Sequence, residues 1–449
     1  MAAADVNRAV EAVWRIESAR LIAGLARTVR DVGLAEDLAQ EALVAALEQW
    51  PESGVPDNPG AWLMATAKRR GIDRLRRDRI AARKSEELGR ELEVRGEAVE
   101  RDLAAAIDDP FDDDLLRLIF TTCHPLLSTE ARVALTLRLL GGLTTPEIAR
   151  AYLISESTVA QRIVRAKRTL AAARVPIEVP VRDQLPERLA AVLEVVYLIF
   201  NEGYSPSSGD AVVRIELLEE AMRLGRILAE LLPTEPEVHG LVALIELQAS
   251  RTRARVDPAG EPVPLLEQDR ARWDWMLIGR GQRALERAYA TGGSFGPYAL
   301  QAAIAACHSR ARDAADTDWV RIAALYDGLA QVSPSPVVGL NRAVAVGMAF
   351  GPGAALELLG DEEMGAALAG YPLLPAARGE MLERLGRDAE ARTQFERAAE
   401  LTANERQARF LRRRAATADA PSATSPRPAG FRLRHGATRD IYEDFKRES

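Results

Sequence analysis

The feature that most constrains this chain is the helical spacing of its apolar residues. Leu34, Leu38, Ala42 and Ala45 recur every three or four residues, and runs that alternate apolar with polar residues are almost absent. Such spacing places apolar side chains on one face of a helix. Aromatic residues make up only 5% of the chain, which also disfavours sheets. We therefore predict an all-α protein.

Length, charge and cysteine content limit the class of protein. At about 150 residues per domain, 449 residues predict roughly three domains. A net charge of −7 excludes a uniformly basic surface but leaves room for local basic patches. Two distant cysteines disfavour a disulfide framework, which favours a reducing compartment. No apolar run is long enough to span a membrane, and we find no signal segment, so we expect a cytoplasmic protein.

Breaks in the pattern divide the chain into segments. A Pro-rich stretch at 51–59 precedes a very basic helix at 61–83, and the charge then becomes strongly acidic. Pro176 and Pro180 interrupt the next helical unit. We expect domains at 1–84, 113–174 and 175–416, with an acidic linker at 85–112 and a disordered tail at 417–449.

Residues 142–170 carry the sharpest local pattern, two short helices joined by a tight turn. Thr144 and Glu147 have the spacing of a capping box, Leu153 and Ile154 form the turn, and Ser155 can cap the second helix. One face of that second helix is apolar, with Val159, Ile163, Ala166 and Leu170. This pattern is typical of a helix-turn-helix that enters the major groove. An ordinary helical hairpin with a solvated charged face is the alternative.

The basic helix at 61–83 is the second pattern. Nine basic residues between Lys68 and Lys84 face only two acidic ones. The helix also carries Trp62 and follows a loop that contains Asn58. Basic residues beside an aromatic ring suit single-stranded nucleic acid, whose bases stack and whose phosphates follow the cations. The alternatives are a solvated charged face and a core position for Trp62.

The order of these parts carries a family resemblance. An acidic helix holds Asp37-Leu-Ala-Gln-Glu41, and Ala61-Trp62-Leu63 and Ile72-Asp73-Arg74-Leu75-Arg76-Arg77 follow it, ahead of the helix-turn-helix. From Val13 to Arg174 the chain resembles the extracytoplasmic-function (ECF) sigma factors of RNA polymerase. The resemblance implies two small helical sigma domains, region 2 and region 4, the second of them a helix-turn-helix.

The resemblance also implies three sets of contact residues. The set that would meet core polymerase is Asp37, Leu38, Gln40 and Glu41. The set that would meet the melted minus-ten element is Asn58, Trp62, Lys68, Arg69, Asp73, Arg74, Arg76 and Arg77. The set that would meet the minus-thirty-five duplex is Ser157, Thr158, Gln161, Arg162, Arg165, Lys167 and Arg168. Capture of an extruded base would offset an unstacking cost of a few kcal/mol, so melting would need no ATP site.

The C-terminal region carries a hint of repeats. The spacing typical of a tetratricopeptide repeat (TPR) is present once, at Gly379, Leu382, Ala391, Phe395 and Ala398. Short helix pairs must stack on their neighbours to bury their apolar faces. Up to about Arg414 the chain resembles the ECF sigma factors that have a TPR-like helical extension. The resemblance implies a helical-repeat domain that regulates the protein or binds a protein partner.

Other candidate sites are weaker. The G-x-G-x-x-A pattern at 279–284 lacks the preceding strand of a dinucleotide site. The Cys-His pairs at 123–124 and 307–308 would chelate poorly, because neighbours on a helix diverge by about 100°. We predict no metal, no cofactor and no enzymatic activity. Segment 201–206 stays open: it is either a helix end with Gly203 as a left-handed cap, or a surface that contacts the sigma domains or a ligand.

These patterns together predict a promoter-specificity subunit with a regulatory extension. Its expected partners are core RNA polymerase and promoter DNA, both as duplex and as the melted non-template strand, with no membrane, in the cytoplasm near the nucleoid. One alternative is a stand-alone helix-turn-helix regulator, which leaves the acidic helix unexplained. Another is an enzyme with a site near Glu202 and Tyr204, for which the sequence offers no convergent acid, base and nucleophile.

Overall fold

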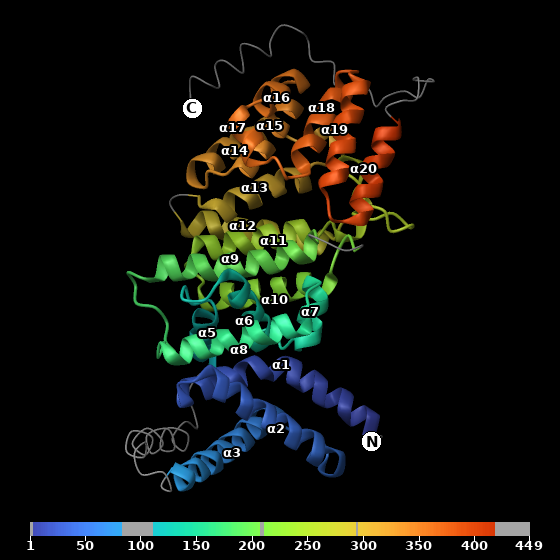
Figure 1. Ribbon diagram of the computed structural model, residues 1–449. Coiled ribbons are helices and arrows are strands. Elements are labelled where there is room, and N and C mark those ends of the chain that lie inside the picture. The colour runs from blue at the N-terminus through green and yellow to red at the C-terminus, as the bar shows by residue number, and fades with distance from the viewer. Residues whose placement is uncertain (1–2, 83–110, 207–210, 293–294, 418–449) are drawn as a thin grey trace. The chain divides into compact units, whose positions relative to one another are not determined.

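The computed structural model describes residues 3–82, 111–206, 211–292 and 295–417. These residues form helices and short 3-10 turns, and the one β-bridge among them joins Val256 and Pro262 (Figure 1). The predicted all-α fold is confirmed. Most of the predicted acidic linker and nearly all of the predicted tail lie outside the described residues. No helix in the described part is long and apolar enough to cross a membrane.

The chain divides into two compact units. The N-terminal unit holds Met1–Phe200 and Glu219–Leu231, and the C-terminal unit holds Asn201–Leu218 and Leu232–Ser449. Each unit is described separately below.

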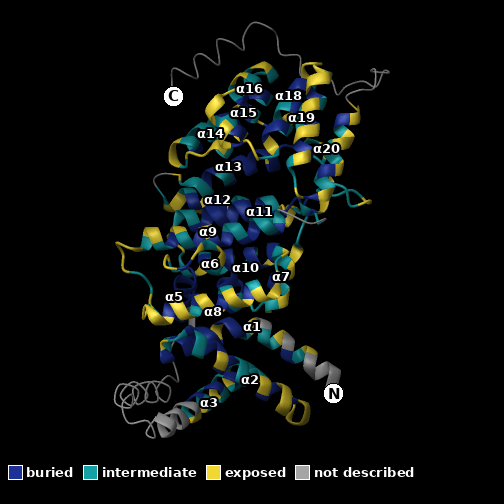
Figure 2. Cartoon of the chain, in the orientation of Figure 1, coloured by how far each residue is buried: buried dark blue, intermediate teal, exposed yellow. Residues whose placement is uncertain are grey.

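Three helices begin the N-terminal unit: α1 (Ala3–Val29), α2 (Val32–Ser53) and α3 (Pro59–Ala82). Asp31 caps α2, since its side chain accepts hydrogen bonds from the backbone N–H groups of Gly33 and Leu34 at 2.8 and 3.0 Å. Of the apolar stripe predicted on α2, Leu38, Ala42 and Ala45 are buried and Leu34 is half-buried, and α2 packs on α1 and α3 (Figure 2). The helix continues through Pro51 and ends at Ser53, before Gly54 in the left-handed region (φ +80°).

Four shorter helices follow in the same unit: α5 (Phe111–Thr122), α6 (Thr129–Leu139), α7 (Thr145–Tyr152) and α8 (Glu156–Ala172). The predicted break at 175–180 is present as a stretch without helix. The compact unit nevertheless extends beyond it, because α9 (Leu185–Tyr204) packs back on these helices. The Arg188 guanidinium donates to the carbonyl of Phe120 at 2.8 Å, and Glu194 pairs with Arg132 at 3.3 Å.

The end of α10 (Ile215–Leu231) also belongs to the N-terminal unit. Arg223 donates to the backbone carbonyl of Leu140 at the end of α6 and pairs with Glu220 on its own helix. Burial raises the pKa of Glu220, and the hydrogen bond from Arg223 opposes that shift. A boundary at residue 175 would therefore separate α9 and α10 from helices on which they pack.

The C-terminal unit is a succession of helices. They are α11 (Pro236–Ala249), α12 (Trp275–Thr291), α13 (Pro297–Arg310), α14 (Trp319–Val332), α15 (Pro336–Phe350), α16 (Pro352–Leu359), α17 (Glu362–Ala367), α18 (Leu373–Arg384), α19 (Asp388–Leu401) and α20 (Glu405–Thr417). Consecutive helices pack side by side along most of this series (Figure 1).

Two details of the C-terminal unit concern segments that the sequence did not settle. Residues 250–274 form a long irregular segment with three single 3-10 turns, because Pro258, Pro262 and Pro264 cannot continue a helix. Gly203 is helical, and it is absent from the glycines with positive φ, so it is not a left-handed cap. Its missing side chain serves a close approach instead: a Cβ there would lie 2.7 Å from the backbone nitrogen of Leu218.

The helix pair α18 and α19 shows how the predicted repeat spacing packs. A three-residue turn joins the two helices, and Gly386 in that turn has φ +74°. Phe395 is buried against Gly379, where a Cβ would lie 2.9 Å from the ring. The small residue at 379 is therefore required by the aromatic ring that fills the space beside it.

Gly379→Ala should destabilise the C-terminal unit by about 1–3 kcal/mol, because the new methyl group overlaps the Phe395 ring in a packed core. The measurement is urea denaturation of the full chain. Gly353→Ala is the control: no atom lies within 4 Å of a Cβ there, so it should be neutral or stabilise by up to about 1 kcal/mol. Equal effects of the two substitutions would show that the Gly379 contact is not tight.

Candidate nucleic-acid interface

Helices α7 and α8 form the predicted helix-turn-helix. The capping box is present: Glu147 accepts from the backbone N–H of Thr144 at 2.7 Å, and the Thr144 hydroxyl accepts from the backbone N–H of Glu147 at 3.4 Å. Leu153 turns the chain in the left-handed region, with φ +50°. Ser155 then caps α8 by accepting from the backbone N–H of Thr158 at 3.1 Å. Local side-chain chemistry therefore sets where both helices begin.

The two faces of α8 separate cleanly. The apolar face is buried, with Val159, Ile163, Ala166 and Leu170. The opposite side carries the residues predicted for the minus-thirty-five duplex, and we call them the recognition face: Ser157, Thr158, Gln161, Arg162, Arg165, Lys167 and Arg168. Ser157, Gln161, Arg165 and Arg168 are exposed, whereas Thr158, Arg162 and Lys167 are half-buried. Hydroxyl donors lie near the N-terminus and cations further along, as a helix in a major groove requires.

Lys167 differs from the rest of the recognition face because it is already paired. Its ammonium group contacts the carboxylate of Glu36 on α2, whose side chain is only 4% exposed. Arg138 on α6 donates to the same carboxylate at 2.6 Å, and Gln40 donates to it at 2.7 Å. We call Glu36, Gln40, Arg138 and Lys167 the Glu36 network. It joins α2 to α6 and α8 inside the N-terminal unit.

The residues predicted to meet polymerase lie along α2. Asp37 is exposed and Glu41 is half-buried. Gln40 belongs to the Glu36 network, and Leu38 is fully buried, so Leu38 supports this helix from the core. Sequence reasoning did not single out Glu36. Its position next to Asp37 in an acidic helix was the available signal, but its two cationic partners, Arg138 and Lys167, lie more than one hundred residues further along the chain.

The residues predicted for the minus-ten element lie around the start of α3. Asn58 is exposed and accepts from the backbone N–H of Ala61 at 3.1 Å, so it caps the helix. Trp62 is half-buried and meets buried Trp50 edge-to-face, with 5.3 Å between ring centroids. Its ring is therefore anchored on the core while part of it stays accessible. Lys68 is half-buried on the same helix, and Arg69 and Asp73 are exposed.

Three of the predicted minus-ten residues can be placed only by their backbone. Arg74, Arg76 and Arg77 lie in α3, and their side chains lie outside the described residues.

The side chains of the Cys-His pair at 123–124 form local hydrogen bonds within the fold. Burial raises the pKa of the Cys123 thiol, and hydrogen bonds with Thr136 and Thr122 oppose that shift. His124 accepts from the backbone N–H of Leu126 at 3.2 Å. Across the described residues, no group of three or more His, Cys, Asp or Glu side chains could hold a metal ion.

Comparison with known families agrees with this geometry. Residues 16–80 match Sigma-70 region 2, and residues 117–170 match Sigma-70, region 4. The ECF RNA polymerase sigma factor SigK of Mycobacterium ulcerans (strain Agy99) is 32% identical over 152 residues, which cover 32% of this chain and 75% of that protein. SigK of Mycobacterium tuberculosis (strain ATCC 25618 / H37Rv) is 32% identical over 150 residues, covering 32% and 74%.

The chain belongs to the ECF RNA polymerase sigma factor family.

This sigma factor also has relatives along its extension. Protein R00370 of Rhizobium meliloti (strain 1021), whose function is uncharacterised, is 45% identical over 390 residues, which cover 86% of this chain and 90% of that protein. Residues 188–289 match a family of unknown function, DUF6596. No solved structure matches the chain. The two sigma regions point to a transcription initiation factor rather than to an enzyme.

Glu36→Gln should loosen the contact between region 2 and region 4. The substitution removes the buried negative charge that Lys167 and Arg138 share, which costs about 2 kcal/mol of local opening free energy. Hydrogen exchange of the α8 backbone in the full chain measures that free energy. Glu48→Gln, at an exposed site on the same helix, is the matched control and should leave exchange unchanged. Unchanged α8 protection in Glu36→Gln would contradict this role for the Glu36 network.

Proposed function

We propose that this sigma factor directs promoter recognition through three surfaces. In this proposal α2 binds core RNA polymerase, the loop at Asn58 and helix α3 capture the melted minus-ten element, and the recognition face of α8 reads the minus-thirty-five duplex. The observation that carries the proposal is α8 itself. Its apolar side is buried while its polar and basic side faces outward at the end of a capped helix-turn-helix.

The start of α3 suits unstacked bases. Trp62 is held in place by the edge-to-face contact with Trp50. A base that stacks on this ring therefore costs little further side-chain entropy. Basic residues further along α3 would follow the phosphates of the strand. Such contacts make binding salt-dependent, with a slope of about −0.7 per neutralised phosphate on single strands.

Region 4 would change its contacts on binding DNA. The Lys167 ammonium group is held by Glu36 in this structure, so a phosphate that binds it competes with this carboxylate. The same exchange frees one side of Glu36 and thereby affects Gln40, which lies among the residues proposed to meet polymerase. Duplex binding and polymerase binding are then coupled through one carboxylate.

For the C-terminal extension we propose a TPR-like repeat domain that regulates initiation or binds a protein partner. The packing of Phe395 on Gly379 between α18 and α19 supports this interpretation, as does the side-by-side stacking of successive helices.

Arg162→Ala together with Arg165→Ala should reduce promoter-dependent transcripts about tenfold or more, because each lost base or phosphate contact costs about 1–3 kcal/mol. Capture of core polymerase by the immobilised full chain should not change. Run-off transcription and capture are measured side by side. Arg182→Ala, at an exposed arginine outside region 4, is the control. If the double variant loses polymerase capture to the same extent, the recognition face has another role.

A further inference from the structure

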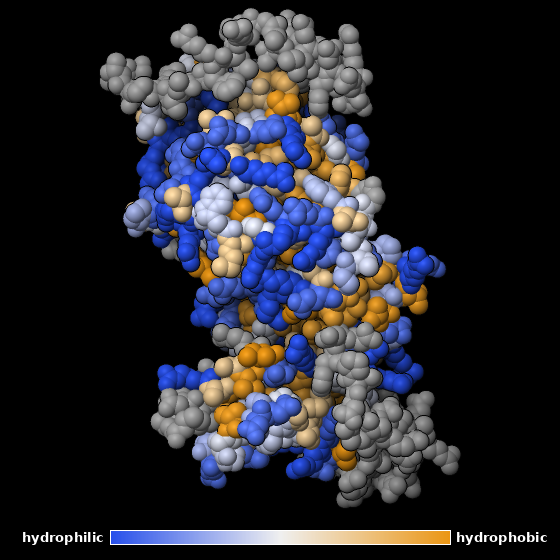
Figure 3. Space-filling model, turned by 180° about the vertical axis from the view of Figure 1, so that it is seen from behind, coloured by the Kyte–Doolittle hydropathy of each residue, from blue (hydrophilic) through white to orange (hydrophobic). Residues whose placement is uncertain are grey.

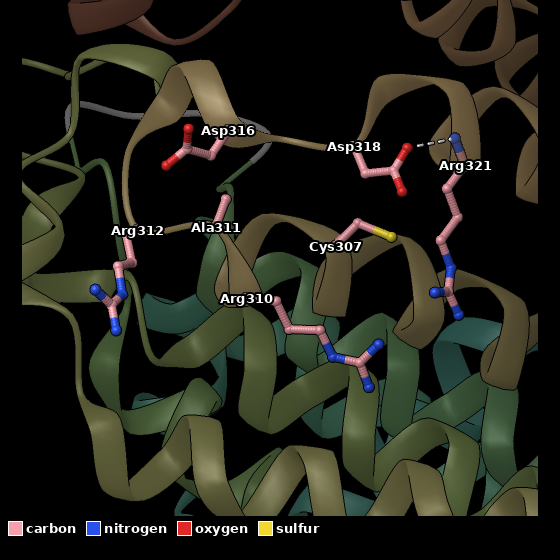
Figure 4. Close-up of a pocket in the computed structure, with 7 residues that line it drawn as sticks. All are labelled: Cys307, Arg310, Ala311, Arg312, Asp316, Asp318 and Arg321. Carbon is pink, nitrogen blue, oxygen red and sulfur yellow. Dashed lines mark hydrogen bonds between the residues drawn. The ribbon is translucent and has the colours of Figure 1, made fainter.

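We propose that the C-terminal unit binds a small oxyanion-bearing metabolite, one with a phosphate or carboxylate group, in the pocket between the end of α13 and the start of α14. The pocket has a volume of about 310 Å³, and Figure 4 labels the residues that line it. All residues of this pocket belong to the C-terminal unit, whereas the residues proposed to meet polymerase and DNA belong to the N-terminal unit. The proposal therefore does not depend on those surfaces.

Two arginine side chains, Arg310 and Arg321, line one side of this pocket. The side chains of Arg310 and Arg321 extend on the same side of Cys307 (Figure 4). Both are exposed, and neither forms an ion pair with any residue in the described part of the chain. A third arginine of the lining, Arg312, is also exposed without such a pair. Cations around one pocket attract an anion that lies among them.

The acidic residues of the pocket are engaged with the backbone. Asp318 accepts from the backbone N–H of Arg321 at 2.9 Å and so caps α14 (Figure 4). Asp316 accepts from the backbone N–H of Asp313 at 3.4 Å. Neither carboxylate forms an ion pair with an arginine of the described chain. The guanidinium groups therefore keep their hydrogen-bond donors available.

The weakly acidic groups nearby are neutral at pH 7. Burial raises the pKa of the Cys307 thiol and of the Tyr289 phenol, and in both cases Arg321 and Arg310 oppose that shift. The same two arginines thus act on both groups. Because burial raises the pKa of the Cys307 thiol, it carries no negative charge at pH 7, and the charge of the pocket is that of its arginines and aspartates.

A second cluster of cations lies behind the end of α13. Arg270 is nine-tenths buried and donates to the carbonyls of His308 and Ala311, whereas its Nε and Nη2 atoms have no partner. Its guanidinium lies 4.6 Å from the centroid of Trp273. Burial, with Arg251 and Arg270, lowers the pKa of His308 to about 3, so this histidine is neutral and adds no charge.

Two more arginines of the cluster lie over aromatic rings. Arg251 lies 6.0 Å from the rings of both Trp273 and Tyr204, and Arg255 lies 3.6 Å from Tyr204. None of Arg251, Arg255 and Arg270 forms an ion pair with a residue of the described chain. Tyr204 lies within the segment 201–206, so its contacts with Arg251 and Arg255 connect that segment with the cationic cluster. Cations without a carboxylate partner near the end of α13 make the local electrostatic potential more positive, which attracts an anion.

Size and chemistry define the ligand class. About 310 Å³ lies at the lower end of the range for small-molecule pockets, about 300–1,000 Å³. The planar guanidinium fork matches phosphate and carboxylate oxygens. Figure 3 shows hydrophilic and hydrophobic side chains interspersed on one face of the molecule, so the ligand class rests on the pocket lining. A compact phosphate ester or a small di- or tricarboxylate fits these properties.

Titration calorimetry of the full chain tests the proposal. The probes are inorganic phosphate, glucose 6-phosphate and citrate, at an ionic strength held constant with sodium chloride. We expect saturable binding of at least one probe, weakened about tenfold or more by Arg310→Gln and by Arg321→Gln. A preference for the two phosphates or for citrate then identifies the anionic group. Both arginines are exposed and unpaired in the described chain, so both variants should fold.

Two control variants separate this site from other basic surfaces. Arg412→Gln, at an exposed arginine of α20, and Arg162→Ala, on the recognition face, should both leave the affinity unchanged. Absence of saturable binding by all three probes would overturn the proposal. Binding that is insensitive to Arg310→Gln and Arg321→Gln would overturn it as well. Loss of binding in Arg162→Ala alone would place the anion on the DNA surface and leave the proposed sigma function standing.

Discussion

The buried carboxylate of Glu36 is the constraint on which the N-terminal unit depends. Moving a charge out of water costs several kcal/mol unless cations and hydrogen-bond donors surround it, and Glu36 takes them from α2, α6 and α8 together. Region 2 and region 4 are therefore held by a contact that is polar and specific. Such a contact can be exchanged, because a phosphate can replace the carboxylate as the partner of Lys167. Stability and DNA recognition consequently share one side chain.

Local features of the site could be predicted from the sequence, because they depend on neighbouring residues. The capping box at Thr144, the turn at Leu153 and the buried face of α8 all follow from spacing and backbone chemistry. The Glu36 network could not, since Glu36 and Arg138 lie 102 residues apart. The packing of α9 on region 4 was missed for the same reason: Pro176 and Pro180 do end the helical run, but a break in a helix need not end a compact unit.

In the C-terminal unit, too, contacts between distant residues could not be predicted from the sequence. Its helices and the contact between Gly379 and Phe395 follow from the sequence pattern. The irregular segment at 250–274 was not predicted, and it carries Arg251, Arg255 and Arg270, of which Arg270 contacts the end of α13. Each of these arginines looks like an ordinary surface charge in the sequence. Only the fold shows that they lie beside aromatic rings, without a carboxylate partner in the described chain.

The measurement that tests the sigma function most directly is run-off transcription with purified core RNA polymerase, from the promoter of a gene that neighbours the one encoding this chain. The account predicts a transcript of defined length that requires the full chain and is absent with core polymerase alone. Tight duplex binding by the chain, with no capture of core polymerase and no transcript, would contradict it and would favour a stand-alone helix-turn-helix regulator.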